Sequence, residues 1–293
     1  METGEILRAA FARRDGLDLQ TDAVRLFDGV GDGLDRLVVE RLGEAIRVTG
    51  APTEAPLLDA VRAALPPETP LFWRFGNDTL GGPDEGRRMV AEGDLRFQVE
   101  LLPNRNTGLF LDARPARRWV RANSDGRRVL NLFSFTGSLG VAAARGGARS
   151  TVNVEPVPRA QARAAENYAA NGLTPDGRTF WRADALEALK RARSGGAQFD
   201  AVILDPPPVP TGGDRGRGGR VDVRADLVRL LRAAREVLAP EGWLLLLCAS
   251  RIVDPDAAAA EAGLGATLWS GTSDGDFVAL PESPTLRLRA FRR

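Results

Sequence analysis

The pattern of hydrophobic and polar positions changes character near residue 103 of the chain. Before that point, short apolar stretches are separated by glycine-containing turns, a pattern typical of strands joined by tight loops. A stretch with helical spacing, Glu54–Leu65, stops at Pro66 and Pro67 because proline cannot continue a helix. Strands are predicted at Val24–Phe27, Arg36–Val39, Ala45–Val48, Leu71–Phe75 and Leu95–Leu101. We expect residues 1–103 to form a small α+β accessory domain.

From about residue 115 onward, short apolar runs alternate with segments of helical period. Strands are predicted at Arg128–Leu132, Thr151–Val154, Thr179–Arg182, Ala201–Leu204 and Trp243–Cys248. Helices are predicted at Pro115–Arg121, Ser138–Arg145, Pro158–Ala170, Ala185–Arg193 and Val223–Leu238. This alternation predicts an α/β fold with a mostly parallel, doubly wound, Rossmann-like sheet over residues 104–293. A final pair, Ala266–Trp269 and Leu286–Phe291, is expected to close the sheet as a hairpin-like edge.

Composition excludes several classes of site. The 293 residues include no histidine, which removes the commonest general base, the commonest metal ligand and every nucleophile that depends on a histidine. The single cysteine, Cys248, excludes an intrachain disulfide and a multi-cysteine metal site, so we expect no metal. The net charge of +1 gives no basic field over the whole chain, although local basic patches are compatible with it.

No segment has the pattern of a targeting signal or a membrane span. The first six residues lack the basic and then apolar order of a secretory signal. The apolar run Trp243–Ala249 is too short to cross a bilayer. We expect a cytoplasmic protein without a membrane partner.

The segment Asn131–Gly140 joins a predicted strand to an alanine-rich predicted helix. Ligands of doubly wound sheets bind beyond the carboxyl ends of the strands, so this turn is a candidate site. Gly137 permits a tight turn and a close approach of a ligand to the backbone. The first glycine of the Gly-x-Gly-x-x-Gly dinucleotide fingerprint is missing, which disfavours a pyrophosphate cofactor. A plain strand-to-helix turn is the alternative.

Three carboxylates follow the ends of the next three predicted strands. Glu155 lies about twenty residues after the glycine turn, where an acidic side chain accepts hydrogen bonds from ribose; alternatively it favours the dipole of the next helix. Asp184 is placed to accept from an adenine amino group, and also to cap the helix that begins at Ala185. Asp205 begins a stiff Asp-Pro-Pro-Pro turn suited to positioning a substrate.

The glycine turn and the acidic proline turn together predict a methyltransferase that uses S-adenosylmethionine. Methyl transfer from a sulfonium depends on alignment of nucleophile, methyl group and sulfur more than on acid–base groups. A chain without histidine is compatible with that chemistry.

Several segments in the same order resemble the bacterial 23S rRNA base methyltransferases, a class I S-adenosylmethionine-dependent family. They are Asn104–Arg114, Leu130–Gly137, Gly146–Ser150, Glu166–Leu173 and Phe199–Pro207. Gly31–Leu34 and the following Leu37–Arg41 are similar to the small α+β domain that precedes the catalytic domain of that family. Two branches fit, the cytosine-C5 enzymes and the guanine-N7 half of a bifunctional rRNA methyltransferase.

The resemblance implies a cofactor site and a candidate catalytic residue. The segment with Thr107 and Asp112 would close over S-adenosylmethionine, and the turn through Ser134 would line its methionine end. Asp205 and Pro206 would face the reacting centre, with Asp205 as a candidate catalytic residue. The complete expected cofactor set is Thr107, Gly108, Asp112, Asn131, Phe133, Ser134, Thr136, Gly137, Glu155, Asp184, Ala185, Asp205 and Pro206.

Two departures from the family bear on the methyl acceptor. The cytosine-C5 branch begins with an RNA-binding PUA domain, and the residues before Val24 are too few for one. C5 of cytosine becomes nucleophilic only after a thiolate adds to the ring, so that branch needs an activated cysteine. The family's cysteine position falls on Ala249 here, and Cys248, one residue earlier on a strand, points to the opposite face. Cys248 is thus the second catalytic candidate after Asp205, but we expect it to be a small buried hydrophobe instead, which favours guanine N7 over cytosine C5.

A Gly- and Arg-rich loop, Thr211–Arg220, follows the acidic turn. Its Arg215, Arg217 and Arg220 are expected to contact a phosphorylated substrate or an RNA backbone, with a plain surface loop as the alternative. The leading functional prediction is methylation of a base in RNA, and in ribosomal RNA first of all. The alternatives are a small-molecule methyltransferase and a cofactor-binding protein that has lost catalysis.

Overall fold

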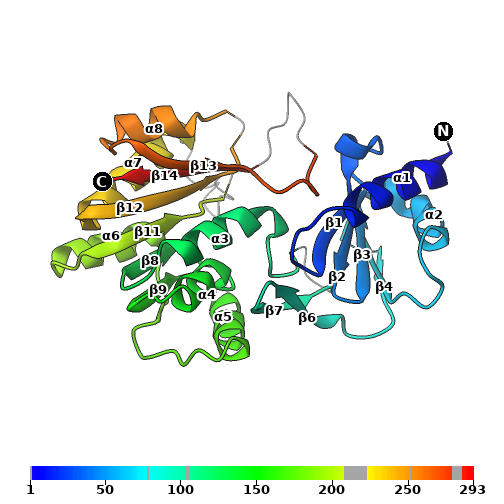
Figure 1. The fold of residues 1–293 in the computed structure, drawn as a ribbon, viewed down its shortest axis with the longest axis horizontal. Helices are drawn as coiled ribbons and strands as arrows, with labels where there is room; N and C mark the ends of the chain where they lie inside the picture. The colour runs from blue at the N-terminus through cyan, green and yellow to red at the C-terminus, as the bar shows by residue number, and fades with distance from the viewer. Residues whose placement is uncertain (1, 78, 103–105, 208–222, 251, 279–285) are drawn as a thin grey trace. The chain divides into compact units, whose positions relative to one another are not determined.

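A computed structural model describes residues 2–77, 79–102, 106–207, 223–250, 252–278 and 286–293. The chain packs as two compact units (Figure 1). The first comprises Met1–Arg114 and Ser273–Thr285, and the second Pro115–Thr272 and Leu286–Arg293. The first unit therefore takes in more than residues 1–103: it extends to Arg114 and includes a segment from near the C-terminus.

The first unit contains a five-stranded sheet with the order β1-β2-β3-β4-β5. Its strands are β1 Ala23–Asp28, β2 Val38–Leu42, β3 Ala45–Gly50, β4 Leu71–Phe75 and β5 Thr79–Gly81. Helices α1 Thr3–Asp15 and α2 Leu58–Ala63 contribute Leu7, Phe11 and Val61 to one apolar core with the sheet. A separate antiparallel ribbon pairs β6 Arg87–Glu92 with β7 Leu95–Glu100.

Two predictions for the first unit were wrong in detail, and helix α1 was missed. The strand expected at Arg36 begins at Val38 instead, because Arg36 has a left-handed φ of 59° that no strand accommodates. The expected helix Glu54–Leu65 is split into the 3-10 turn η2 Pro52–Leu57 and α2, because Pro56 inside the segment removes a backbone donor. Helix α1 was not predicted, and its inner face ends in the buried Arg14 rather than in an apolar residue.

The second unit is a seven-stranded sheet with the order β10-β9-β8-β11-β12-β14-β13. The strands are β8 Arg128–Leu132, β9 Ser150–Val154, β10 Phe180–Trp181, β11 Phe199–Leu204, β12 Leu238–Cys248, β13 Thr267–Gly271 and β14 Arg287–Arg292. Strands β8 to β12 pair in parallel, and β14 is antiparallel to both β12 and β13. The mostly parallel sheet and its antiparallel closing pair are confirmed.

Helices cover both faces of this sheet (Figure 1). The helices are α3 Arg114–Ala122, α4 Ser138–Arg145, α5 Pro158–Ala170, α6 Ala185–Ser194, α7 Val223–Val237 and α8 Pro255–Glu261. Leu244 and Leu246 of β12 pack into a core with α6, α7 and α8. Trp243 lies on the opposite face, where its ring meets Trp119 of α3 edge-on at 4.7 Å between centroids. Coverage on both faces explains why the central strands are continuous apolar runs rather than alternating ones.

The strand order reverses between β8 and β11, which are neighbours in the sheet but not in the sequence. Strands β8, β9 and β10 run outward to one edge, and β11 and β12 run outward to the other. In doubly wound sheets, such a reversal leaves a crevice at the carboxyl ends of the strands, where ligands bind. The residues that follow β8 to β12 are therefore the ones placed to bind a ligand.

Candidate functional site

The turn between β8 and α4 has an unusual backbone. Phe133 and Phe135 have left-handed φ angles of 57° and 48°, and Gly137 has one of 75°. A left-handed conformation costs a residue other than glycine about 1–3 kcal/mol, and it persists only where the surroundings enforce it. Two phenylalanines in this conformation within one turn indicate a loop shaped for a task rather than for its own stability.

Backbone and side-chain hydrogen bonds from β9 hold this turn. Ser134 N donates to Val154 O at 3.0 Å, and Phe135 N donates to Glu155 Oε2 at 3.1 Å. Within the turn, Gly137 N donates to Ser134 O at 2.7 Å. The end of β9 therefore determines the path of the chain after β8.

Gly137 is required by the packing of the turn, and the expected close approach of a ligand to it stays a prediction. A Cβ atom built on Gly137 would lie 2.9 Å from Ala164 Cβ of α5, closer than real side chains approach each other. The positive φ adds a second requirement, since glycine adopts it without steric cost. The glycine thus allows α5 to pack against the turn.

Glu155 is buried at the end of β9, where both of its oxygens accept backbone hydrogen bonds. Oε2 accepts from Phe135 N at 3.1 Å, and Oε1 accepts from Val157 N, just before α5, at 3.0 Å. A carboxylate has about four acceptor positions, so each oxygen keeps one for a further donor. Glu155 both organises the turn and retains acceptor capacity beside it.

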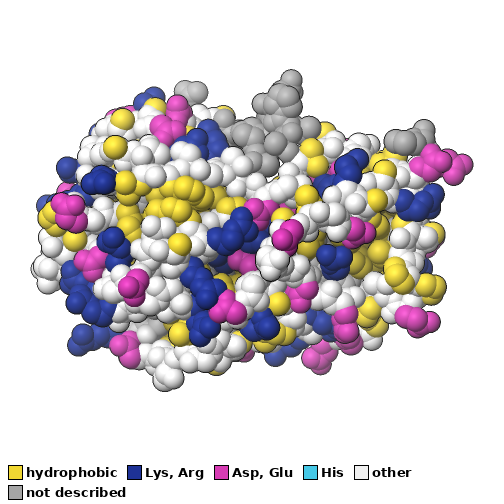
Figure 2. Space-filling model, in the orientation of Figure 1, with side chains coloured by type: hydrophobic (Ala, Val, Ile, Leu, Met, Phe, Trp, Pro, Cys, Tyr) yellow, Lys and Arg dark blue, Asp and Glu magenta, His cyan; other side chains and the backbone are white. Residues whose placement is uncertain are grey.

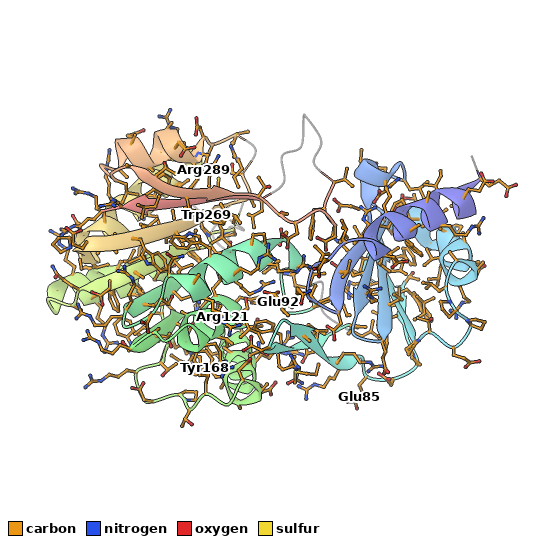
Figure 3. The ribbon with its side chains drawn as sticks, in the orientation of Figure 1. Glu85, Glu92, Arg121, Tyr168, Trp269 and Arg289 are labelled. Atoms are coloured by element: carbon orange, nitrogen blue, oxygen red, sulfur yellow. The ribbon has the colours of Figure 1, made fainter. Side chains whose placement is uncertain are left out.

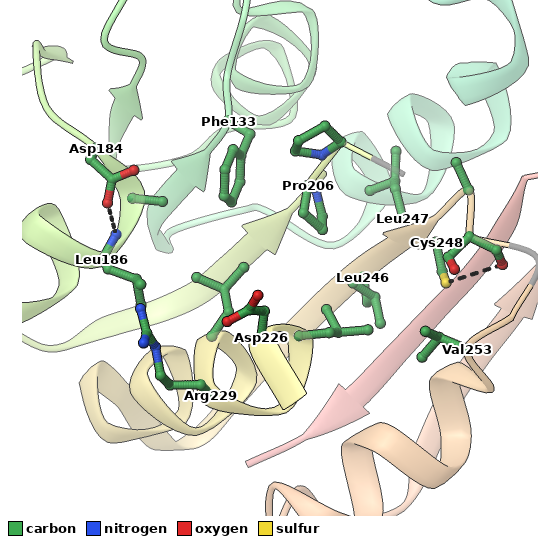
Figure 4. A pocket seen from close by; sticks show the side chains of 16 residues that line it. Phe133, Asp184, Leu186, Pro206, Asp226, Arg229, Leu246, Leu247, Cys248 and Val253 are labelled. Carbon is green, nitrogen blue, oxygen red and sulfur yellow. Dashed lines mark hydrogen bonds between the residues drawn. The ribbon is translucent and has the colours of Figure 1, made fainter. Parts of the chain in front are cut away.

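Asp184 caps α6, as one of its two predicted roles required. Its Oδ1 accepts from Leu186 N at 2.8 Å and from Glu187 N at 3.4 Å. The side chain is exposed and lines a cavity (Figure 4). Because Oδ1 makes both capping bonds, capping is compatible with a second interaction through Oδ2.

A cavity of about 310 Å³ opens at the carboxyl ends of β11 and β12 (Figure 4). Four expected cofactor residues line it: Phe133, Asp184, Ala185 and Pro206. Its walls are mostly apolar and come also from α7 and β12, with Leu227, Leu230, Leu246, Leu247 and Val253 among them. A volume near the lower end of the roughly 300–1,000 Å³ range suits a small-molecule site.

The sequence did not indicate the contribution of α7 to this cavity. Asp226 and Arg229, both exposed, line it together with Leu230. The available signal was positional, since α7 is the helix that follows the Asp205 turn. Asp205 itself lies just before Pro206, at the end of β11.

Two buried polar atoms near the turn have no hydrogen-bond partner among the described residues. They are Ser134 Oγ and Asn131 Oδ1. Asn131 lies within β8 and donates through Nδ2 to Asn153 Oδ1 at 3.0 Å, so it belongs to a buried network rather than to the cavity wall. A buried polar atom without a partner is costly, which makes Ser134 Oγ a candidate contact for a ligand.

The expected burial of Cys248 is confirmed. Its side chain is 4% exposed and packs into the core with Leu246, although it also borders the cavity. Sγ lies 3.7 Å from Arg287 Nη2 and 4.0 Å from Ser250 O. Ala249, the next residue, is exposed. A catalytic role of Cys248 remains a prediction, as does that of Asp205.

The remaining predicted residues lie elsewhere. Thr107, Gly108 and Asp112 belong to the first unit, where Thr107 Oγ1 donates to Leu109 O at 3.3 Å and Asp112 lies in the 3-10 turn η3 Leu111–Ala113. Their closure over a cofactor stays a prediction. The loop arginines Arg215, Arg217 and Arg220 lie outside the described residues, as does Pro208.

Among the described residues, no three Asp, Glu or Cys side chains gather in a way that could hold a metal ion. None of the described helices combines the length and the apolar character needed to span a bilayer.

Comparison with known proteins links this geometry to a chemistry. A family model described as S-adenosylmethionine-dependent methyltransferase matches residues 75–269. The ribosomal RNA large subunit methyltransferase K/L of Chromohalobacter salexigens is 38% identical over 193 residues, covering 66% of this chain and 26% of that protein. The ribosomal RNA large subunit methyltransferase I of Cronobacter sakazakii is 29% identical, covering 84% of this chain and 64% of its own. The chain thus spans about a quarter to two thirds of the length of these relatives.

Solved structures agree on the fold. A putative S-adenosylmethionine-dependent methyltransferase from Streptococcus mutans has a TM-score of 0.88 at 21% identity, covering 99% of this chain and 80% of that one. A structure with the same TM-score and coverage is titled a putative methyltransferase complexed with SAH. At this identity the likeness shows the fold alone. The sequence resemblance and the class I methyltransferase fold predicted from it are confirmed.

Proposed function

Because the chain belongs to the S-adenosylmethionine-dependent methyltransferase family, we propose that it holds this cofactor at the carboxyl ends of β8, β9 and β10 and methylates a base in ribosomal RNA. The names of the curated relatives, ribosomal RNA large subunit methyltransferases, support the RNA substrate. The observation that carries the cofactor site is the strained turn after β8, held by the buried Glu155.

The residues of the second unit fit this cofactor. Ser134 Oγ is a buried polar atom without a protein partner in the described structure, as expected for a group that contacts a ligand. Glu155 keeps acceptor capacity for the two ribose hydroxyls, and Asp184 Oδ2 for the adenine amino group. The apolar wall at Phe133 and Pro206 suits a flat ring. When bound, S-adenosylmethionine supplies an electrophilic methyl group on a sulfonium.

The protein's own task is then alignment and exclusion of water. Pro206 and Pro207 give the acceptor side of the cavity a rigid wall, because the proline ring fixes φ. The apolar residues of β12 and α7 keep solvent away from that wall. Asp205, at the end of β11, would orient the acceptor base. Such positioning accounts for the rate gain expected of a reaction with a good leaving group.

We further propose direct transfer to an atom with its own lone pair, such as guanine N7, rather than addition of a thiolate to the base. This rests on Cys248, whose side chain packs into the core formed with α7 and α8. An attacking thiolate needs an accessible setting, and the side chain of Cys248 is only 4% exposed although Arg287 Nη2 lies 3.7 Å from Sγ. The exposed position at this strand end is occupied by Ala249, which carries no nucleophile.

The distribution of charge keeps a small-molecule acceptor as a second candidate. On the face drawn in Figure 2, basic and acidic side chains are interspersed rather than gathered into one basic field. Most RNA-binding surfaces gain affinity from such a field, so its absence on this face favours a smaller acceptor. A chain with net charge +1 would have to bind RNA through local patches.

An incubation with methyl-labelled S-adenosylmethionine separates the candidates. The protein is offered ribosomal RNA transcribed without modifications, and in parallel a metabolite extract. The proposal predicts label in the RNA, with a transfer rate that falls steeply as salt rises. Label only in small molecules would contradict the RNA substrate and leave the cofactor site intact.

A further inference from the structure

Asn167 of α5 contacts the strained turn directly, in addition to the bonds that the turn makes with the end of β9. Its side chain is 1% exposed, and Nδ2 donates to Thr136 O at 2.9 Å. Thr136 is also 1% exposed and lies between the left-handed Phe135 and Gly137. The bond therefore acts on the backbone at the centre of the strained segment.

One face of α5 carries this contact and two others. Ala164, Asn167 and Tyr168 are spaced three and four residues apart, so they share a face of the helix. Ala164 lies against Gly137, as described above, and Tyr168 approaches Gly140 at the start of α4. Helix α5 thus contacts the chain at Thr136, at Gly137 and, one turn further on, at Gly140.

A buried network beneath Gly140 fixes the position of this helix face. Asn153 Nδ2 of β9 donates to the Tyr168 hydroxyl at 2.8 Å, and that hydroxyl also bonds Thr151 Oγ1 at 2.8 Å. Burial raises the pKa of Tyr168 to about 12, so the hydroxyl stays protonated at neutral pH. Tyr168 is marked in Figure 3. The network ties α5 to β9, whose final residue Val154 also accepts a bond from Ser134 N of the turn.

We infer that Asn167 is a positioning residue that holds the Phe133–Gly137 turn in the shape that binds the adenosyl cofactor. The inference rests on the cofactor site proposed above. The left-handed phenylalanines would relax if a restraint were removed. A turn that is correct only part of the time lowers affinity in proportion to the fraction that is competent. Asn167 therefore acts on ligand affinity through Thr136, without touching the ligand itself.

The test compares variants of two buried asparagines of the same segment. Asn167→Asp keeps the size of the side chain but places an oxygen instead of a donor against Thr136 O. Asn171→Ala is the control, because Asn171 Nδ2 donates to Asn167 O, a backbone carbonyl of α5. Calorimetric titration with S-adenosylhomocysteine gives the affinity, and thermal unfolding gives the stability of each variant.

We expect Asn167→Asp to lower the affinity for S-adenosylhomocysteine by about tenfold or more, the equivalent of roughly 1.4 kcal/mol. Asn171→Ala should bind as the wild type does, whatever its loss of thermal stability. Equal affinities for Asn167→Asp and wild type would overturn the inference while leaving the cofactor site standing. Failure of the wild type to bind would overturn the cofactor site, and this inference with it.

A measurement on the unmodified protein covers the case in which the variant does not fold. Hydrogen exchange of the free protein reports the amides of Ser134, Phe135 and Gly137, whose bonds define the turn. If the turn is held in place before binding, these amides should be protected from exchange in the free protein. Addition of S-adenosylhomocysteine should then increase their protection only slightly. Fast exchange in the free protein, with protection only on binding, would overturn the inference.

Discussion

The two units are stabilised internally by different chemistry. In the first unit, Arg14 donates to both oxygens of the buried Asp32, and Arg114 donates to both oxygens of Asp276, which is fully buried. In the second unit, a buried network beside β8 joins the neutral Asn131, Asn153 and Tyr168, and the buried carboxylate of Glu155 holds the turn that follows β8. The comparison teaches that buried charge pairs fasten the first unit, whereas the ligand-facing turn of the second is shaped by neutral hydrogen bonds together with the buried carboxylate of Glu155.

The Asp276 pair has a structural purpose that the sequence does not reveal. Arg114 begins α3, and Asp276 lies in the segment between β13 and β14. Their pairing, with Arg25 N donating to Asp276 Oδ2 at 3.0 Å, fastens that segment into the first unit. Burial alone would lower the pKa of Arg114, but its bonds to Asp276 and Asp274 raise it.

The largest effect is predicted for removing one partner of a buried charge pair in the first unit. Asp276→Ala leaves Arg114 buried without its main partner, and we expect a loss of about 3–5 kcal/mol of unfolding free energy. Urea unfolding measures this loss. Glu44→Ala, which removes an exposed partner of Arg88, is the control and should leave the urea midpoint essentially unchanged. A midpoint for Asp276→Ala close to the control would contradict a stabilising role for the buried pair.

A somewhat smaller effect is expected for disturbing the neutral network beside β8 in the second unit. A Cβ atom on Gly140 would lie 2.1 Å from Asn153 Oδ1 and 2.7 Å from the Tyr168 hydroxyl, so Gly140→Ala forces the network apart. We expect a destabilisation of about 1–3 kcal/mol by overpacking, seen as a lower urea midpoint. Gly177→Ala, where a Cβ meets open space, is the matched control and should have little effect. Equal midpoints for the two variants would show that the network tolerates displacement.

Lowering the pH should reduce the stability of the first unit by protonating Asp32. Burial would raise the pKa of this carboxyl, but hydrogen bonds from Arg14, the backbone of Asp28 and Arg13 outweigh it and hold the pKa below its ordinary value. A depressed pKa contributes stability that is complete above the unfolded value near 3.9 and is lost as pH falls through the lower folded value. Thermal unfolding followed by circular dichroism should therefore show a decline below about pH 4.

Asp32→Asn provides the control for the acid prediction. The variant should be less stable than wild type at neutral pH and should lose part of the decline below about pH 4, since its side chain does not titrate. An unchanged acid profile would mean that other carboxyls carry the pH dependence.

The smallest effect is predicted for Cys248→Ala. The side chain packs in the core and, in the mechanism proposed here, does not react. We expect full methyl transfer to the acceptor and a stability loss of about 1 kcal/mol, typical of a small truncation in a core. Loss of transfer with cofactor binding intact would contradict direct transfer and favour a covalent thiol.

The sequence predicted the helices and strands of the second unit far better than it predicted the strained backbone of the candidate site. Helices α4 and α5 begin and end where expected, because apolar runs, Gly137, Pro158 and the Asn171-Gly172 pair mark their ends. The left-handed Phe133 and Phe135 were not predictable, since phenylalanine has no preference for that conformation. Their shape depends on Glu155 and Asn167, which belong to distant segments and act only once the chain is folded.

Contacts between residues far apart in the sequence explain the other features that the sequence did not predict. The segment after Ser273 joins the first unit through Asp276 and Arg114, which are 162 positions apart. The lining of the cavity by α7 depends on how that helix packs against β12, which the periodicity of α7 does not specify. Local patterns predicted the elements, and long-range contacts determined which side chains meet.

The most direct test of the central claim is calorimetric titration of S-adenosylhomocysteine into the wild type and Glu155→Ala. Glu155 holds the turn through Phe135 N and keeps acceptors for ribose, so we predict saturable binding to the wild type and an affinity about 100-fold lower in the variant. Glu187→Ala, which removes an exposed carboxylate from the first turn of α6, should bind as the wild type does. Absence of binding to the wild type, or equal affinity in Glu155→Ala, would contradict the account.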